Sequence, residues 1–192
     1  MKPMVEKDVI IGISGASGSI FGVKLLKMLK SIPTIRTHLV MSKPAEITLK
    51  AENDLSGIDI QSLADVYHNN KNIGACIASG SYNVKAMIIA PCSIKTMSEI
   101  AGGVTTSLLS RSADVCLKER KPLILGVREM PFHSGHLRNM ALLSDLGAFI
   151  APPVPAFYTN PKTIDEMVTQ ICCRWLSFAS IELPEKITWS GL

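Results

Sequence analysis

The chain has 192 residues, of which 47% are hydrophobic and 19% charged, and its formal net charge at pH 7 is +4. Charge this mild and scattered excludes the strongly basic surface that nucleic-acid binding requires. No stretch approaches the roughly 18–20 unbroken apolar residues of a membrane-spanning helix. The apolar excess is therefore expected in subunit contacts and in the core of one domain, covering residues 1–192.

The start of the chain and its cysteines indicate the cellular compartment of the protein. Residues 1–7 are polar and lead directly into an apolar run, without the hydrophobic segment of a secretory signal peptide. The five cysteines form no C-x-x-C pair, and their odd number argues against a complete disulfide framework. We therefore expect a cytoplasmic protein with reduced thiols.

Apolar runs of strand length alternate with segments of helical periodicity along the chain. The first strand is expected over residues 8–13, and a helix over 20–30 places Leu25, Leu26 and Leu29 on one face. Further strands are expected over 37–41, 86–90, 122–127 and 148–151, and further helices after Pro44 and over 96–100, 107–120, 137–146 and 163–180. Residues 53–81 are less periodic and are expected to form loops around a short helix.

This alternating order predicts an α/β, Rossmann-like (flavodoxin-like) three-layer sandwich, with a parallel sheet covered by helices on both faces. We find no repeat, low-complexity segment or linker that would divide the chain. In such a sheet, ligands bind beyond the carboxyl ends of the strands, where the strand order reverses. The residues that follow each predicted strand are therefore the first candidates for a site.

A glycine-rich segment, Gly12-Ile13-Ser14-Gly15-Ala16-Ser17-Gly18, joins the first strand to the first helix. Its glycines permit a tight turn and close approach of a phosphate or ring, while the helix start offers free N–H groups to an anion. The spacing is not G-x-G-x-x-G, and the second strand offers no acidic ribose partner. A mononucleotide is favoured over NAD, although a purely structural turn fits the same glycines.

Hydroxyl groups follow the next two predicted strands at the same edge of the sheet. Ser42 follows the second, and Pro91-Cys92-Ser93-Ile94-Lys95-Thr96 follows the third. Hydroxyls and helix-start amides suit the polar edge and phosphate of a flavin without a metal. Ser93 and Thr96 also fit as plain helix caps.

A set of basic and phenolic residues favours an anionic ligand. Arg111 and Lys118 lie seven residues apart on one predicted helix, and therefore on nearly the same face. Arg128 follows the next strand, Tyr158 ends a proline-rich run, and Arg174 lies in the last helix. Together such groups would hold a phosphate leaving group through charge-assisted hydrogen bonds. Considered singly, each also fits a surface salt bridge.

Seven segments in consistent order between residues 9 and about 178 resemble the UbiX-like flavin prenyltransferase family. They are GISGASGS at 12–19, LVMSK at 39–43, SGS at 79–81, PCSIKT at 91–96, ADVCLKERKPL at 113–123, VREMP at 127–131 and PPVPAFY at 152–158. The chain departs from the family at Thr106-Ser107-Leu108-Leu109, where D-N-L-L is common, and at Ser112, where R-A-A-D-V is usual. Neither change removes a charged ligand.

The resemblance implies a prenyltransferase that joins the dimethylallyl group of dimethylallyl phosphate to N5 and C6 of reduced FMN. The product, prenylated FMN, would serve a UbiD-type decarboxylase. The family forms homo-oligomers, specifically dodecamers, in which neighbouring subunits share site residues. No metal is expected, and the sequence has no D-D-x-x-D acidic pair. His133 and His136, spaced as H-x-x-H, are expected to be structural.

The resemblance also implies a role for each matching residue. The catalytic residues would be Glu52, Ser17 and Glu129, with Glu52 assisting proton movement. FMN would bind at Gly15, Ala16, Ser17, Ser42, Ser93, Ile94, Lys95, Thr96 and Arg128. The phosphate of the donor would lie among Ser79, Arg111, Lys118, Glu129, Tyr158 and Arg174.

Two other classes of protein stay open. A flavin-dependent decarboxylase of peptidyl or pantothenoyl cysteine shares the fold, but would carry a methionine-rich segment where this chain has PPVPAFY. A non-catalytic FMN carrier subunit would keep the glycine loop and residues 93–96. It would have no need for Arg111, Lys118, Tyr158 and Arg174 together. The sequence does not indicate which decarboxylase receives the product.

Overall fold

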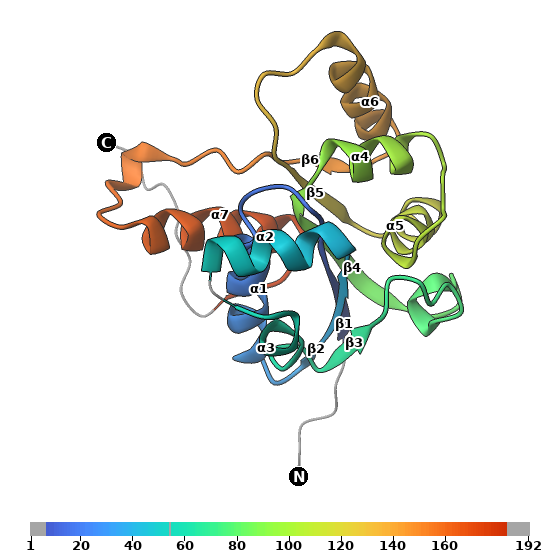
Figure 1. Ribbon diagram of the computed structural model, residues 1–192, viewed down its shortest axis with the longest axis horizontal. Coiled ribbons are helices and arrows are strands. Elements are labelled where there is room, and N and C mark those ends of the chain that lie inside the picture. The colour runs from blue at the N-terminus through green and yellow to red at the C-terminus, as the bar shows by residue number, and fades with distance from the viewer. Residues whose placement is uncertain (1–6, 54, 184–192) are drawn as a thin grey trace.

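A computed structural model describes residues 7–53 and 55–183, so most of the polar N-terminal segment lies outside the described residues. A six-stranded sheet runs through this part of the chain in the order β3-β2-β1-β4-β5-β6 (Figure 1), and every neighbouring pair is parallel. The predicted parallel sheet is confirmed. Its strands are β1 (Lys7–Ile13), β2 (Ile35–Met41), β3 (Val66–His68), β4 (Val84–Cys92), β5 (Leu123–Val127) and β6 (Phe149–Ile150).

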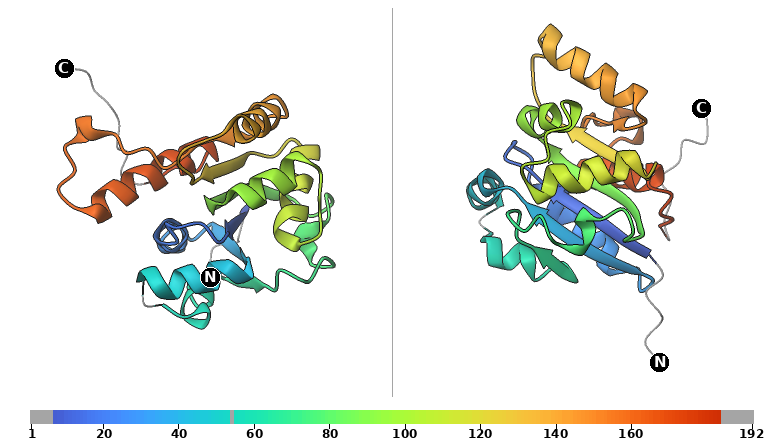
Figure 2. Two further views of the ribbon diagram at one scale, coloured as in Figure 1. Left: turned by 45° about the horizontal axis from the view of Figure 1, so that its top comes forward. Right: turned by 90° about the vertical axis from the view of Figure 1, so that its right-hand side faces the viewer.

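Helices cover both faces of the sheet and make the three predicted layers (Figure 2). The helices α1 (Ile20–Lys30), α2 (Lys43–Asn53), α3 (Gly57–Gln61) and α7 (Ile164–Phe178) contribute to the core of one face. The helices α4 (Ile94–Ala101), α5 (Leu108–Lys118) and α6 (Ser134–Asp145), with the 3-10 turn η1 (Cys76–Ala78), contribute to the core of the other. A second 3-10 turn, η2, spans Phe157–Thr159.

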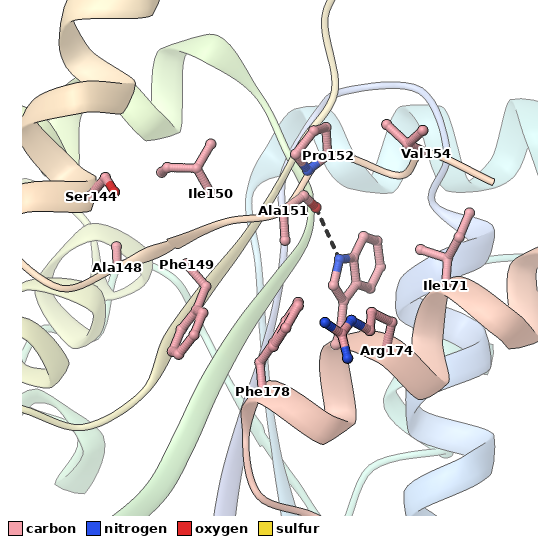
Figure 3. Close-up of a pocket in the computed structure, with 11 residues that line it drawn as sticks. Ser144, Ala148, Phe149, Ile150, Ala151, Pro152, Val154, Ile171, Arg174 and Phe178 are labelled. Carbon is pink, nitrogen blue, oxygen red and sulfur yellow. Dashed lines mark hydrogen bonds between the residues drawn. The ribbon is translucent and has the colours of Figure 1, made fainter. Parts of the chain in front are cut away.

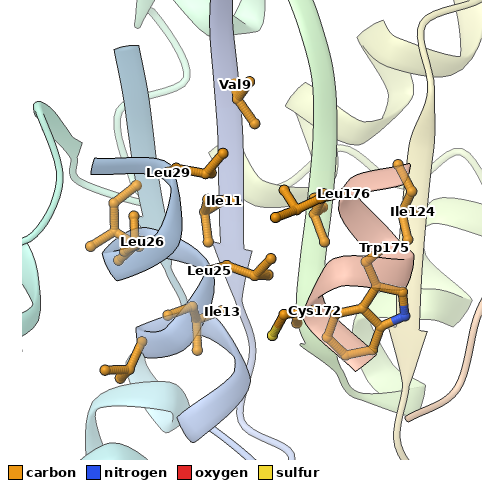
Figure 4. Close-up of a cluster of buried hydrophobic side chains, with 14 of the residues drawn as sticks. Val9, Ile11, Ile13, Leu25, Leu26, Leu29, Ile124, Cys172, Trp175 and Leu176 are labelled. Atoms are coloured by element: carbon orange, nitrogen blue, oxygen red, sulfur yellow. The ribbon is translucent and has the colours of Figure 1, made fainter. Parts of the chain in front are cut away.

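The central strands are buried on both faces, which explains their unbroken apolar sequences. In β1, Val9, Ile11 and Ile13 face α1 and α7, whereas Ile10 faces the opposite layer. Figure 4 shows α1 and α7 packed side by side on the first of these faces. The indole Nε1 of Trp175 donates to the carbonyl of Ala151, which joins α7 to the chain beyond β6 (2.9 Å).

Two expectations about the elements were wrong. Residues 53–81 contain a strand, β3, as well as the expected short helix. That strand has three half-buried residues and pairs only with β2 at the sheet edge, so it carries no strand periodicity. The helix expected over 107–120 ends at Lys118, and Arg120 has a φ of 53°, which α-helical residues do not adopt.

No helix within the described ranges is long and apolar enough to cross a membrane.

Candidate active site

The strand order reverses between β1 and β4. From β1 the chain proceeds outward to β2 and β3, and then returns to the other side of β1 for β4, β5 and β6. In open α/β sheets the loops that leave the two strands at such a reversal diverge, and ligands bind in the crevice between them, at the carboxyl ends of the strands. The glycine-rich loop and the segment after β4 are the two sides of this crevice.

Backbone hydrogen bonds join the segments that follow four strands at this edge. Ser42 N donates to Ile13 O (3.0 Å), which joins the ends of β2 and β1. Arg128 N donates to Cys92 O (3.0 Å), which joins the ends of β5 and β4. The structure therefore brings together the glycine loop, Ser42, the Ser93 turn and Arg128, as predicted.

Ser14 connects the two sides of the crevice, and sequence analysis did not single it out as a site residue. Its buried Oγ donates to the carbonyl of Pro91 (2.8 Å) and accepts from the N–H of Ser93 (2.7 Å). Ser14 N also donates to Pro91 O (3.2 Å). One sequence feature could have identified Ser14 as a site residue: it is a polar residue directly after a buried strand, in a loop expected to approach a ligand.

Gly15 shapes the crevice because a side chain has no room there. A Cβ added at Gly15 would lie 2.3 Å from Cβ of Pro44, in the first turn of α2. Glycine at this position therefore lets the loop pack closely against the start of α2. The glycine loop fits a bound mononucleotide as well as a structural turn.

The start of α4 supplies donors to the other side of the crevice. Ser93 is the N-cap, and its Oγ accepts from the N–H of Thr96 (3.3 Å) while donating to Thr96 Oγ1 (3.2 Å). The capping alternative for Ser93 is thus confirmed. Helix geometry leaves the N–H groups of Ile94 and Lys95 without intrahelical partners, so they can hold an anion. The Lys95 side chain is exposed and pairs with Glu99 (3.0 Å).

Glu52 lies against the start of α1. Its carboxylate accepts from the N–H groups of Gly18 (2.9 Å) and Ser19 (2.9 Å) and from Ser19 Oγ (2.8 Å). Partial burial raises the pKa of Glu52, but hydrogen bonds from Ser17, Ser19 and the Gly18 N–H outweigh burial and lower the pKa. Glu52 is therefore held as a carboxylate in this arrangement.

A lowered pKa bears on the proton transfer expected of Glu52. A carboxylate that accepts several hydrogen bonds is a weaker base than a free one, because protonation would break them. Ser17 is exposed on the same loop and hydrogen-bonds to Glu52. Glu52 gains basicity only if a ligand displaces these donors.

A second group of expected site residues gathers around η1 and α5. Arg111 Nε donates to Ala78 O (3.2 Å) and its Nη1 pairs with Asp114 (2.9 Å). Lys118 pairs with Glu119, and its Nζ would lie 2.5 Å from a Cβ added at Gly80. Arg111 and Lys118 thus face the same Ser79-containing turn, which confirms their predicted placement on one helix face.

The remaining expected residues lie elsewhere. Arg128 and Glu129 follow β5 at the carboxyl edge, and Glu129 Oε1 accepts from the N–H of Met130 (3.0 Å). Tyr158 is exposed in η2. The Arg174 guanidinium lies over the ring of Phe178, 4.5 Å from its centroid.

Arg174 also lines a cavity of about 380 Å³ between α7 and the chain around β6. Figure 3 shows the guanidinium beside apolar walls that include Phe149, Val154, Ile171 and Phe178. A single basic group among apolar side chains suits a ligand with an anionic end and a hydrocarbon end.

One chain does not bring all six expected donor-site residues together. Ser79 precedes β4 and Lys118 precedes β5, whereas Glu129 follows β5 at its carboxyl end. The nine residues of β4 alone span roughly 26 Å at about 3.3 Å per residue. Ser79 and Lys118 therefore lie toward the amino ends of the strands, whereas Glu129 lies at their carboxyl ends.

His133 of the H-x-x-H pair has a local structural role, as expected, whereas the buried Nδ1 of His136 has no hydrogen-bond partner among the described residues. His133 is the N-cap of α6, and its Nδ1 accepts from the N–H groups of Gly135 (3.0 Å) and His136 (3.4 Å).

The parallel sheet, the glycine loop and the amide- and hydroxyl-lined crevice define an α/β protein that binds a nucleotide phosphate. The model of the family described as Flavoprotein matches residues 2–175. Flavin prenyltransferase UbiX of Escherichia coli is 51% identical over 187 residues, covering 96% of this chain and 99% of the relative. The chain therefore belongs to the Flavoprotein family and, within it, to the UbiX-like flavin prenyltransferases.

Two solved structures agree. A crystal structure of AnUbiX (PadA1) in complex with FMN and dimethylallyl pyrophosphate has a TM-score of 0.94 and 40% identity, covering 97% of this chain and 99% of that one. A dodecameric FMN-dependent UbiX-like decarboxylase from Escherichia coli has a TM-score of 0.92 and 43% identity, covering 96% of this chain and 100% of that one.

Proposed function

We propose that this chain is a flavin prenyltransferase that transfers a dimethylallyl group from dimethylallyl phosphate to reduced FMN. The observation that carries the proposal is the convergence of the glycine loop, Ser42, the start of α4 and Arg128 at one crevice. Near full-length similarity to flavin prenyltransferases supports it. Reduced FMN, when bound there, would supply nucleophilic N5 and C6 positions for the prenyl group.

The protein's own residues would act mainly on the leaving phosphate. Departure of phosphate from an allylic ester leaves a dianion, which positively charged and hydroxyl donors stabilise. Arg111, Lys118, Tyr158 and Arg174 are assigned to that task. The apolar walls beside Arg174 would keep water from the allylic group. Glu52, with Ser17, would take up the proton that is released.

The site would be completed between subunits, because one chain separates Lys118 from Glu129. Large apolar side chains are exposed around the carboxyl edge and η2, among them Met130, Val154 and Phe157. Such patches mark contact surfaces. We propose a homo-oligomer, specifically a dodecamer of about 250 kDa, twelve times the 20.8 kDa chain.

Subunit mixing would test the shared site. Lys118→Ala and Glu129→Gln variants are prepared separately, dissociated, mixed and reassembled. If one active site combines Lys118 of one chain with Glu129 of another, the mixed assembly should regain activity, because some of its sites then contain both native residues. No recovery above the separate variants, despite native-mass assemblies, would place both residues in one chain's site.

The recipient of the product is part of the same proposal. Prenylated FMN would pass to a UbiD-type decarboxylase in the cytoplasm. Adding such an apo-decarboxylase to the reaction should yield decarboxylation only when this chain, reduced FMN and the donor are all present.

The direct test is anaerobic incubation of the purified protein with reduced FMN and dimethylallyl phosphate, followed by mass spectrometry of the extracted flavin. A flavin carrying one added prenyl unit supports the transferase. The diphosphate is run in parallel to define the donor. Unmodified flavin with both donors, despite tight FMN binding, would favour the carrier. Oxidative decarboxylation of a peptide C-terminal cysteine would favour the cysteine decarboxylase.

A further inference from the structure

A cluster of nitrogen and sulfur ligands lies apart from the crevice, where three neighbouring segments of the chain meet. It consists of His38 in β2, His68 in β3 and Cys76 at the start of η1. One ligand atom from each residue lies within 4.8 Å of the other two. Imidazole nitrogen and thiolate sulfur are the usual ligands of zinc.

The two imidazoles point their nitrogens at each other. His38 Nδ1 lies 2.8 Å from His68 Nε2. The ring planes are nearly parallel, with 8° between them. In a tetrahedral zinc site, Zn–N bonds of about 2.0–2.1 Å hold two ligating nitrogens about 3.4 Å apart. To admit an ion, the histidines need to separate by about 0.6 Å, and His68 must move its proton from Nε2 to Nδ1, because its Nε2–H donates to His38 Nδ1 without the ion.

A carboxylate holds His38 in the tautomer that a metal requires. His38 Nε2 lies 3.1 Å from Asp8 Oδ1, so the imidazole donates from Nε2 and keeps a lone pair at Nδ1. Arg36 fixes Asp8 in turn through two hydrogen bonds, of 2.5 and 3.0 Å. A carboxylate behind a ligating histidine is the common outer shell of protein zinc sites.

The three ligands differ in their exposure. His38 is 1% exposed and His68 is half-buried. Cys76 is exposed, which leaves an entry path for an ion.

We propose that His38, His68 and Cys76 form a zinc site that joins β2, β3 and η1. The sequence analysis did not expect a metal, and this one is separate from the prenyl-transfer chemistry. Its place in the fold gives it a structural role, because η1 directly precedes Ser79 and its Ala78 carbonyl binds Arg111. An ion here would hold that turn against the sheet edge.

Cobalt titration tests the site directly. Untagged protein is stripped with chelator and titrated with Co²⁺, which reports a bound thiolate through a ligand-to-metal charge-transfer band and tetrahedral coordination through strong visible bands. Both should appear with one equivalent per chain, and Zn²⁺ should abolish them. Cys173→Ser is the matched control, because Cys173 is a half-buried cysteine on α7 away from the cluster.

Variants at the two accessible ligands make the outcome specific. Cys76→Ser should lose the charge-transfer band, and His68→Gln should bind Co²⁺ at least about tenfold more weakly. Circular dichroism checks that both remain folded. The site is refuted if native protein shows neither band at saturating Co²⁺, or if Cys76→Ser keeps the charge-transfer band. These readouts do not depend on prenyl transfer, so the two proposals can fail separately.

Discussion

Replacing serine by alanine should have opposite effects on the stability of the fold at two buried positions. Ser14 and Ser112 are both 0% exposed, and replacing either by alanine removes one hydroxyl from the interior. Ser14 Oγ makes two hydrogen bonds across the crevice, whereas Ser112 Oγ has no partner among the described residues.

The expected costs follow from this difference. Ser14→Ala loses the bonds to Pro91 and Ser93 and leaves the Ser93 N–H without its acceptor. A net loss of about 0.5–1.5 kcal/mol for the bond to Pro91, and about 1–3 kcal/mol for the unsatisfied Ser93 donor, gives a destabilisation of about 1.5–4.5 kcal/mol. Ser112→Ala removes an unsatisfied group, so it should be neutral or stabilising by up to about 1 kcal/mol.

The free energy of unfolding is measured by urea denaturation at one fixed chain concentration, because assembly adds to apparent stability. FMN affinity is measured on the same samples by flavin fluorescence. Ser14→Ala should also bind FMN more weakly, since Ser14 sets the start of α4 against the glycine loop, and Ser112→Ala should bind FMN normally. Equal stability of the two variants, or normal FMN affinity in Ser14→Ala, would refute this role.

Three further predictions concern the proposed active site. Gly15→Ala should weaken FMN binding, because the new alanine Cβ would lie 2.3 Å from Cβ of Pro44 and displace the glycine loop. Gly74→Ala is the control: its Cβ would lie 3.5 Å from the nearest atom, so this variant should bind FMN normally in the same titration. Glu52→Gln should slow turnover but not FMN binding. Because the folded-state pKa of Glu52 lies below its usual 4.5, the carboxylate stabilises the fold above pH 4.5, and this contribution is lost as the pH falls from 4.5 through the folded-state pKa. The melting temperature of native protein should therefore fall more between pH 7 and pH 3 than that of Glu52→Gln. Lys118→Ala should lower the rate of prenyl transfer about 10²–10³-fold, the usual effect of losing one preorganised donor, with unchanged FMN affinity; an unchanged single-turnover rate would contradict this.

Local sequence patterns were sufficient for most of the fold. The helix expected over residues 20–30 is observed as α1 with the same bounds, because its apolar face repeats at helical spacing. The buried strands β1 and β4 are apolar runs long enough to recognise. The short edge strand β3 escaped prediction because pairing with β2, rather than its own three residues, makes it a strand.

The candidate site divides in the same way. Gly15, Ser42, Ser93 and Arg128 could be predicted to meet, because each follows a strand and parallel strands end at one edge. That Ser14 would join the two sides of the crevice, and that Glu52 would lie at the start of α1, could not be predicted. Both depend on hydrogen bonds between residues more than 30 positions apart.

The amino-acid sequence by itself determined the order of the elements, the carboxyl-edge loops and the family, because each is written in local periodicity or in contiguous motifs. Only the tertiary structure decided the strand order, the separation of Lys118 from Glu129, and the meeting of His38, His68 and Cys76. The physical reason is that strand register and side-chain packing are set by contacts between distant segments. Those contacts leave no periodic trace in the chain.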